Sequence, residues 1–305
     1  MDVNKKTVVF EDGRILILRI GDRVSSDEST IFFGDLPLSF YGPNGKTNTF
    51  QEEKYFCYKT DRIPFDLDKN LYLVFFKGLQ DMTPEQKKKS PSNGWGIRDF
   101  ASAFKKAFLR TEVSSVKKFD LIGRSKGGLW AATFLILLEE EHLKIWKFKI
   151  LAMGTPFGGT IMADTEKLYP ALKKHGIRGQ IAAKFHEAIF TGEQWDLDCI
   201  PNSNFLNWLH KEANVWAPCT FVVAGLAKGC WLKKLFRFKF VEFGCEYAAK
   251  NILGLVAESD NDGVVEYNRV AVFGLRAMIV ECSHEEFLSN QRLLEEIFNR
   301  FGSIE

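Results

Sequence analysis

The sequence lacks the features that mark several classes of protein. It has only 9 Pro in 305 residues, and 46% of its residues are hydrophobic, which excludes a disordered or collagen-like chain. The longest uncharged apolar run, Leu129 to Leu138, has about half the length that spans a bilayer. Lys and Arg total 41 against 39 Asp and Glu, so the net charge is +2 and no global field favours nucleic acid. We expect a soluble globular protein with no nucleic acid partner.

The cysteines and the first residues predict a cytoplasmic location. The 6 cysteines form no C-x-x-C pair, which indicates buried thiols in a reducing compartment and no disulfide framework or zinc site. The first apolar stretch ends at Phe10, before Glu11 and Asp12, so no secretory signal is recognisable. The spacing of the acidic residues does not require calcium, and we expect no metal and no cofactor.

Apolar runs of strand length alternate with helical patterns from residue 71 onward. Leu71 to Phe76 is continuously apolar, which is typical of a strand buried on both faces of a parallel sheet. From Ile97 the apolar residues follow helical spacing. Further strands are predicted at 119–122, 148–153, 221–224 and 277–280, with a buried helix at 129–138 and a final amphipathic helix carrying Phe287, Leu294, Phe298 and Phe301. This alternation predicts an α/β fold with a mostly parallel, doubly wound sheet, whose ligands bind at the carboxyl ends of its strands.

Three regions lie outside this alternation. Residues 1–70 predict short strands, among them a hairpin formed by Thr7–Phe10 and Ile15–Ile20. Residues 157–216 carry helical patterns at 168–174 and 205–211 and predict a helical cap over the sheet's edge. Residues 228–251 alternate aromatic and basic side chains, which favours a half-buried strand over contact with a lipid surface. Without a repeat or a linker, residues 1–305 are predicted to form one domain.

One motif points to chemistry. Gly123-Arg124-Ser125-Lys126-Gly127 matches G-x-S-x-G, with an apolar strand before it and a helix after it. Such a sharp turn lifts a serine hydroxyl clear of the sheet, and its glycines leave space where a Cβ would collide with backbone. This context favours Ser125 as a nucleophile over the alternative, a glycine-rich turn with a capping serine. Arg124 and Lys126 are expected to be solvated or packed along the surface, in preference to binding an anionic acyl donor.

A serine nucleophile needs a general base, and the base needs an orienting acid. In one common arrangement the chain order is serine, acid, histidine, and His284 is the histidine that follows the most suitable acidic loop. His284 comes after the predicted strand 277–280, at the start of the last helix. Asp262 precedes it in an Asn-Asp-Gly turn, with Asp260 and Glu258 as rivals. A surface histidine and solvated turn carboxylates are the alternatives.

Five segments, in this order, resemble the α/β-hydrolase lipases and esterases, especially bacterial triacylglycerol lipases. They are Phe76-Lys77-Gly78-Leu79, Gly123 to Gly128, Gly154-Thr155-Pro156-Phe157-Gly158-Gly159-Thr160, Asn261 to Val265, and His284. The resemblance covers residues 71–160 and about 217–300. It implies that Ser125 is the nucleophile, His284 the base and Asp262 the orienting acid, with an oxyanion hole formed by the main-chain N–H groups of Leu79 and Lys126.

The resemblance therefore implies a serine hydrolase that cleaves carboxylic esters, of lipids or other small molecules, through an acyl-serine intermediate. An acyltransferase or thioesterase on the same residues is the alternative among enzymes, and a non-catalytic binding protein is the alternative from another class. The chain departs from the family at Lys77 and Phe157, where such lipases usually carry His, and at Arg124 and Lys126. These departures leave the main-chain oxyanion donors intact and the preferred substrate open, as is the oligomeric state.

Overall fold

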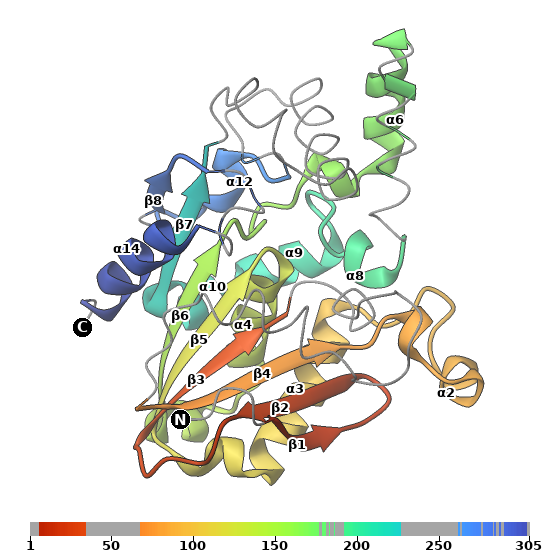
Figure 1. Ribbon diagram of the computed structural model, residues 1–305. Helices are drawn as coiled ribbons and strands as arrows, with labels where there is room; N and C mark the ends of the chain where they lie inside the picture. Colours follow the sequence, from red (N-terminus) through yellow and green to blue (C-terminus); the bar gives the residue numbers. More distant parts are fainter. Residues whose placement is uncertain are drawn as a thin grey trace.

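One twisted sheet organises the chain (Figure 1). The computed structural model describes residues 6–34, 68–176, 192–226, 264–275, 277–282 and 290–303, together with residues 179, 180, 183, 186, 262, 284 and 287. Within them the strand order is β1-β2-β4-β3-β5-β6-β7-β8. The pairs β1/β2 and β2/β4 are antiparallel, and the five pairs from β4/β3 to β7/β8 are parallel. The predicted α/β fold with a mostly parallel, doubly wound sheet is confirmed.

The eight strands are β1 (Lys6–Glu11), β2 (Ile15–Ile20), β3 (Glu28–Phe33), β4 (Asn70–Phe76), β5 (Lys118–Arg124), β6 (Lys147–Met153), β7 (Thr220–Gly225) and β8 (Ala277–Val280). The α-helices described are α2 (Pro84–Lys89), α3 (Ile97–Arg110), α4 (Lys126–Leu137), α5 (Glu140–Ile145), α6 (Thr165–Lys173), α8 (Gln194–Leu197), α9 (Asn204–Lys211), α10 (Ala213–Trp216), α12 (Tyr267–Val270) and α14 (Gln291–Gly302). The 3-10 turns are η2 (Leu79–Asp81), η3 (Glu112–Ser115), η4 (Ile161–Ala163) and η5 (Ala217–Cys219).

The continuous apolar run of β4 is buried on both faces of the sheet. Tyr72, Val74 and Phe76 point into one hydrophobic cluster. Leu71, Leu73 and Phe75 point into the other, because successive side chains of a strand alternate between faces. Both sides of the sheet are therefore covered, as the apolar run predicted.

Helices α3 and α4 cover one face of the sheet, and α14 covers the other (Figure 1). The helical spacing predicted for α3 is confirmed, since Phe100, Phe104 and Phe108 are fully buried. The prediction for the final helix is wrong at its start. Asn290 accepts a hydrogen bond from the Leu293 N–H and caps α14 there, so Phe287 precedes this helix.

The N-terminal part of the chain contributes more than a hairpin. Strand β3 lies in the middle of the sheet, parallel to β4 on one side and β5 on the other. Within the predicted cap, α6 and α9 confirm the helical patterns at 168–174 and 205–211. Residues 35–67 and the aromatic and basic segment 228–251 lie outside the described residues. Among the residues that are described, no helix has the length and apolar character needed to cross a membrane.

Candidate active site

Ser125 stands on a strained turn between β5 and α4. Its φ is 52° and its ψ is −128°, a conformation that non-glycine residues rarely adopt and that is concentrated at functional sites. Although Ser125 occupies the N-cap position of α4, its side chain makes no capping hydrogen bond. A capping serine would have ordinary extended backbone and would accept a bond from the first turn. The geometry therefore favours the strained strand-to-helix turn over the simple cap.

Two glycines make this turn sterically feasible. A Cβ on Gly123 would lie 2.2 Å from the carbonyl carbon of Gly127, and a Cβ on Gly127 would lie 2.5 Å from the Phe33 carbonyl oxygen. Neither contact is compatible with any other residue unless the backbone moves. The glycines of the motif are thus explained by close backbone approach, and Phe33 at the end of β3 forms part of the wall around the turn.

Asp262 and His284 form a buried pair. His284 Nδ1 lies 2.7 Å from Asp262 Oδ2, and the two residues are 5% and 1% exposed. The other carboxylate oxygen, Oδ1, accepts hydrogen bonds from the N–H groups of Val264 and Val265 at 2.9 and 2.8 Å. The His284 N–H also donates to the Asp262 carbonyl oxygen. The carboxylate is therefore fixed on both oxygens, which orients the imidazole and leaves its Nε2 for other partners.

The end of β6 brings this pair beside the Ser125 turn. The Ser125 N–H donates to the Met153 carbonyl oxygen at 2.8 Å. The next residue, Gly154, has φ +56°, and a Cβ there would lie 2.8 Å from Asp262 Oδ2 and 2.9 Å from His284 Nδ1. Ser125 thus contacts Met153, and the Asp262–His284 pair lies against the next residue, Gly154, at the carboxyl edge of the sheet. The rivals Asp260 and Glu258 lie outside the described residues.

The two residues expected to supply oxyanion donors follow β4 and β5, the two strands that flank β3. Leu79 begins the turn η2 after β4, and Lys126 begins α4. The Leu79 N–H donates to Glu193 Oε2 at 3.0 Å. Glu193 is 6% exposed, and burial raises the pKa of its carboxyl above the ordinary value. The predicted donor is therefore engaged by a carboxylate from the segment before α8.

The side chains beside Ser125 are largely withdrawn from water, so the expectation that they are solvated or packed along the surface was wrong. Arg124 is 2% exposed. The Lys126 side chain is 11% exposed, and its Nζ lies 3.1 Å from Asp196 Oδ1 and 3.3 Å from the centre of the Trp195 ring. The buried carboxylate and the ring face together explain why a cation can lie inside the protein.

Residues 193–198, which include α8, supply acidic groups that sequence reasoning missed. Besides the two contacts above, Asp198 Oδ2 accepts the N–H of Ile97 at the start of α3, at 2.7 Å. Burial raises the pKa of the Asp198 carboxyl. The sequence offered one sign of this role: three carboxylates lie close together here, interspersed with Trp195 and Leu197. That pattern does not say which backbone groups the carboxylates contact.

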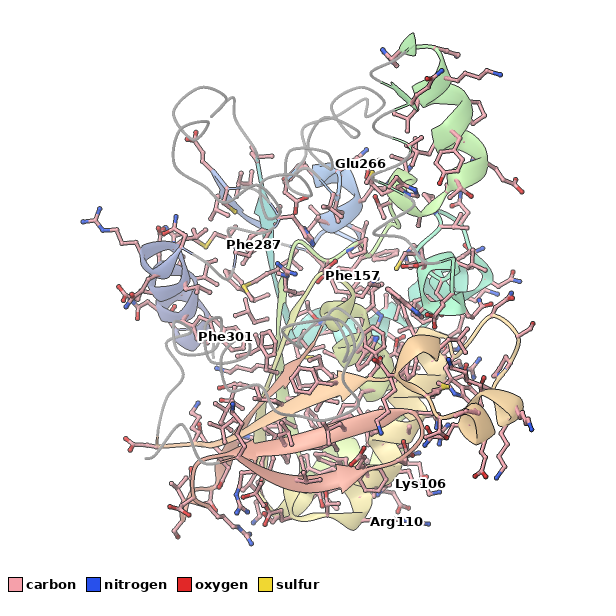
Figure 2. The ribbon with its side chains drawn as sticks, turned by 45° about the vertical axis from the view of Figure 1, so that its right-hand side comes forward. Lys106, Arg110, Phe157, Glu266, Phe287 and Phe301 are labelled. Carbon is pink, nitrogen blue, oxygen red and sulfur yellow. The ribbon has the colours of Figure 1, made fainter. Side chains whose placement is uncertain are left out.

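The two positions where family lipases usually carry His have local explanations. Lys77 is buried and forms an ion pair with Glu11 at 2.6 Å. Phe157 stacks on Trp216 with the ring centres 4.6 Å apart. Figure 2 shows Phe157, Glu266 and Phe287 in the upper part of the molecule, at the carboxyl edge of the sheet, whereas Lys106 and Arg110 lie on α3 at the opposite end. Among the described residues, no group of three or more His, Cys, Asp and Glu side chains is arranged to hold a metal ion.

Solved structures of hydrolases have similar folds. A lipase of Bacillus licheniformis, BlEst2, in its mature form has a TM-score of 0.58 and 14% identity, over 97% of this chain and 100% of that chain. Its propeptide form has a TM-score of 0.54 and 15% identity, over 97% of this chain and 55% of that chain. An alpha/beta hydrolase fold protein from Chitinophaga pinensis has a TM-score of 0.47 and 12% identity, over 98% of each chain. No protein-family model and no curated protein matches the sequence.

Proposed function

Because the chain has the α/β-hydrolase fold, we propose that it is a serine hydrolase that cleaves carboxylic esters through an acyl-serine intermediate. One observation carries the proposal: the strained, uncapped Ser125 is bonded to Met153, and the buried Asp262–His284 pair lies against the next residue, Gly154. Nucleophile, base and orienting acid on neighbouring loops are what acyl transfer by serine requires. The similarity to a structure called a lipase is consistent with this class.

The proposed reaction has two halves. In the first, Ser125 Oγ attacks the ester carbonyl carbon while His284 Nε2 takes the hydroxyl proton, and Asp262 stabilises the imidazolium. The tetrahedral intermediate collapses, and His284 returns the proton to the leaving alcohol. In the second half, water attacks the acyl-serine with His284 again as base, which releases the carboxylic acid and regenerates Ser125. The negative charge that develops on the carbonyl oxygen needs N–H donors, and those of Leu79 and Lys126 are proposed for this role.

An active-site-directed probe tests the proposal. A fluorophosphonate reacts with an activated serine, so the wild-type protein is expected to be labelled and Ser125→Ala to remain unlabelled, with both proteins shown to be folded by circular dichroism. Wild type is also expected to hydrolyse members of an ester series from acetyl to oleoyl. Equal labelling of the two proteins would remove Ser125 from the mechanism.

The acyl acceptor separates the proposed hydrolase from its alternatives. If the acyl group is transferred to added glycerol or lysolipid in preference to water, the protein is an acyltransferase, and faster cleavage of thioesters identifies a thioesterase. A folded protein that turns over none of these substrates is a binding protein. A cytoplasmic location stays a prediction. Contact of residues 228–251 with a lipid surface stays the alternative to a half-buried strand, because this segment lies outside the described residues.

A further inference from the structure

The Leu79 main-chain N–H cannot serve a substrate while it serves Glu193. The distance of 3.0 Å from Leu79 N to Glu193 Oε2 is that of a full hydrogen bond. Its acceptor is a carboxylate, which binds an N–H group more strongly than a neutral ester carbonyl does. An oxyanion hole with one of its donors already bound to an anion stabilises a transition state less.

Neighbouring backbone encloses the Glu193 carboxylate. A Cβ on Gly94 would lie 2.8 Å from Glu193 Oε2 and 3.3 Å from the Leu79 side chain. The adjacent residue Asn93 accepts a hydrogen bond from the Gln194 N–H at 2.6 Å. The loop before α3 thus packs against the carboxylate and anchors the next residue, Gln194, and the burial of Glu193 shields it from water that would otherwise compete for it.

Residues 193–198 also contact the residue that follows Ser125. Asp196 pairs with the side chain of Lys126, the residue directly after Ser125, and Trp195 packs between that amine and Phe76. Asp198 holds the first N–H of α3. We define residues 193–198 as the acidic strap, because three of its carboxylates each contact a different loop at the carboxyl edge of the sheet.

We propose that Glu193 is an internal competitor for the oxyanion hole: its carboxylate occupies the Leu79 N–H in the resting protein and must leave before an ester carbonyl oxygen can take that donor. The proposal rests on the proposed function, since it assumes acyl transfer at Ser125. It makes the strength of one hydrogen bond within the acidic strap a determinant of acylation rate. A residue of the acidic strap that does not contact Leu79, such as Asp198, is expected to have no influence on the acylation rate.

Substitution at Glu193 gives a direct test. Glu193→Ala removes the acceptor, and we expect the second-order rate of fluorophosphonate labelling of Ser125, and kcat/KM for p-nitrophenyl butyrate, to rise by about fivefold to twentyfold. Glu193→Gln keeps a weaker, neutral acceptor and is expected to give a smaller rise of about threefold. The Leu79 amide proton is expected to shift upfield in Glu193→Ala. A merely structural role for Glu193 predicts lower rates in both variants.

Asp198→Asn is the matched control. It changes another buried carboxylate of the acidic strap but leaves the Leu79 contact in place, so its labelling rate is expected to equal that of wild type. Equal acceleration by Asp198→Asn would show that loosening the strap is sufficient, and would overturn the specific role of Glu193. Unchanged or lower rates in both Glu193 variants, with wild type labelled at Ser125, would overturn the inference and leave the proposed function standing.

Two further outcomes separate the inference from the proposed function. If Glu193→Ala is labelled at Ser125 and wild type is not, the resting protein is fully blocked, which supports both. If neither protein is labelled and neither hydrolyses any ester, the proposed function fails, and the inference fails with it. In a crystal structure of the labelled wild-type protein, the phosphonyl oxygen is expected at the Leu79 N–H with Glu193 displaced; a retained Glu193 contact would contradict the inference.

Discussion

The two ends of the central strands use carboxylates in opposite ways. At the amino ends of β3 and β5, Glu28 forms ion pairs with Lys69 and Lys118 at 2.8 and 2.9 Å, and Lys69 also pairs with Asp120. At the carboxyl ends, Glu193 and other acids are withdrawn from water and mostly accept main-chain N–H groups, with Asp196 alone of the acidic strap paired to a lysine.

The pKa values record this difference. Hydrogen bonds from Lys69 and Lys118 lower the pKa of Glu28 to about 2. Burial raises the pKa of Glu193, Asp198 and Glu266. Charge is therefore favourable in the folded state at the amino end and unfavourable at the three carboxyl-end positions. Carboxyl groups with perturbed pKa values are concentrated at functional sites, so this contrast directs attention to the carboxyl edge.

The largest expected difference between the two ends is in catalysis. Asp262→Asn leaves the shape of the pair but removes the charge that we propose orients His284 and stabilises its imidazolium, so kcat is expected to fall by about 10⁴-fold. The matched change at the amino end, Asp120→Asn, is expected to leave kcat unchanged. Steady-state ester hydrolysis by the two purified variants measures kcat for each. A comparable fall of kcat in Asp120→Asn would contradict the functional contrast between the two ends.

The second expected effect is on stability. Asp196→Ala leaves the amine of Lys126 buried without its carboxylate, and we expect the free energy of unfolding in urea to fall by about 3 kcal/mol. The double variant Lys126→Met/Asp196→Leu removes both charges and is expected to recover most of that loss. If the single variant is as stable as wild type, the ion pair is not desolvated as the structure implies.

At the amino end the expected effect is smaller and depends on pH. Glu28→Gln removes a charge that the folded state favours, which is expected to cost about 1 kcal/mol at pH 7 after allowance for solvent screening. Because the pKa of Glu28 is lowered to about 2 from 4.5, its contribution is present above pH 4.5 and is lost as the pH falls toward 2. Urea unfolding of wild type and Glu28→Gln from pH 2.5 to 8 is expected to converge at the acid end. A gap that stays constant with pH would contradict the assigned cause.

The smallest expected effect has the opposite sign. Asp198→Asn keeps an oxygen for the Ile97 N–H and removes a carboxylate whose pKa is raised by burial from 3.8, so the variant is expected to be more stable than wild type by under about 1 kcal/mol at pH 7. As the pH falls through the raised pKa, Asp198 of the wild-type protein becomes protonated and loses its charge. The difference in stability between wild type and Asp198→Asn is therefore expected to vanish below pH 3.8. Thermal unfolding at pH 3.5 and 7 is sufficient to detect this, and a loss of stability at pH 7 would show that the charge itself is needed there.

The sequence predicted the parts of this molecule that depend on local pattern. The apolar run of β4 and the helical spacing of α3 are patterns among residues close together in the sequence. The glycines of G-x-S-x-G likewise show, from the sequence alone, that the turn needs residues without a Cβ. Chain order pointed to His284, and the Asn-Asp-Gly turn with the family resemblance favoured Asp262 over Asp260 and Glu258. The structure brings Asp262 and His284 into contact, although their roles in catalysis stay predictions.

What the sequence did not reveal depends on contacts between distant residues. Glu193 is 114 residues from the Leu79 N–H that it accepts, and no periodicity relates the two. The burial of the Lys126 amine likewise depends on Asp196 and the Trp195 ring, which come from another segment. The place of β3 between β4 and β5 is a matter of sheet topology, which the short apolar run Ile31-Phe32-Phe33 alone does not specify.

The contact between Gly127 and the Phe33 carbonyl oxygen has a consequence for how the protein matures. The turn that presents Ser125 is completed by the end of β3, a strand made early in synthesis that has to wait for β5 before it gains its second partner. Closing such long loops is entropically slow. A newly made chain is therefore expected to complete the turn around Ser125 late, after β5 has paired with β3 at the centre of the sheet.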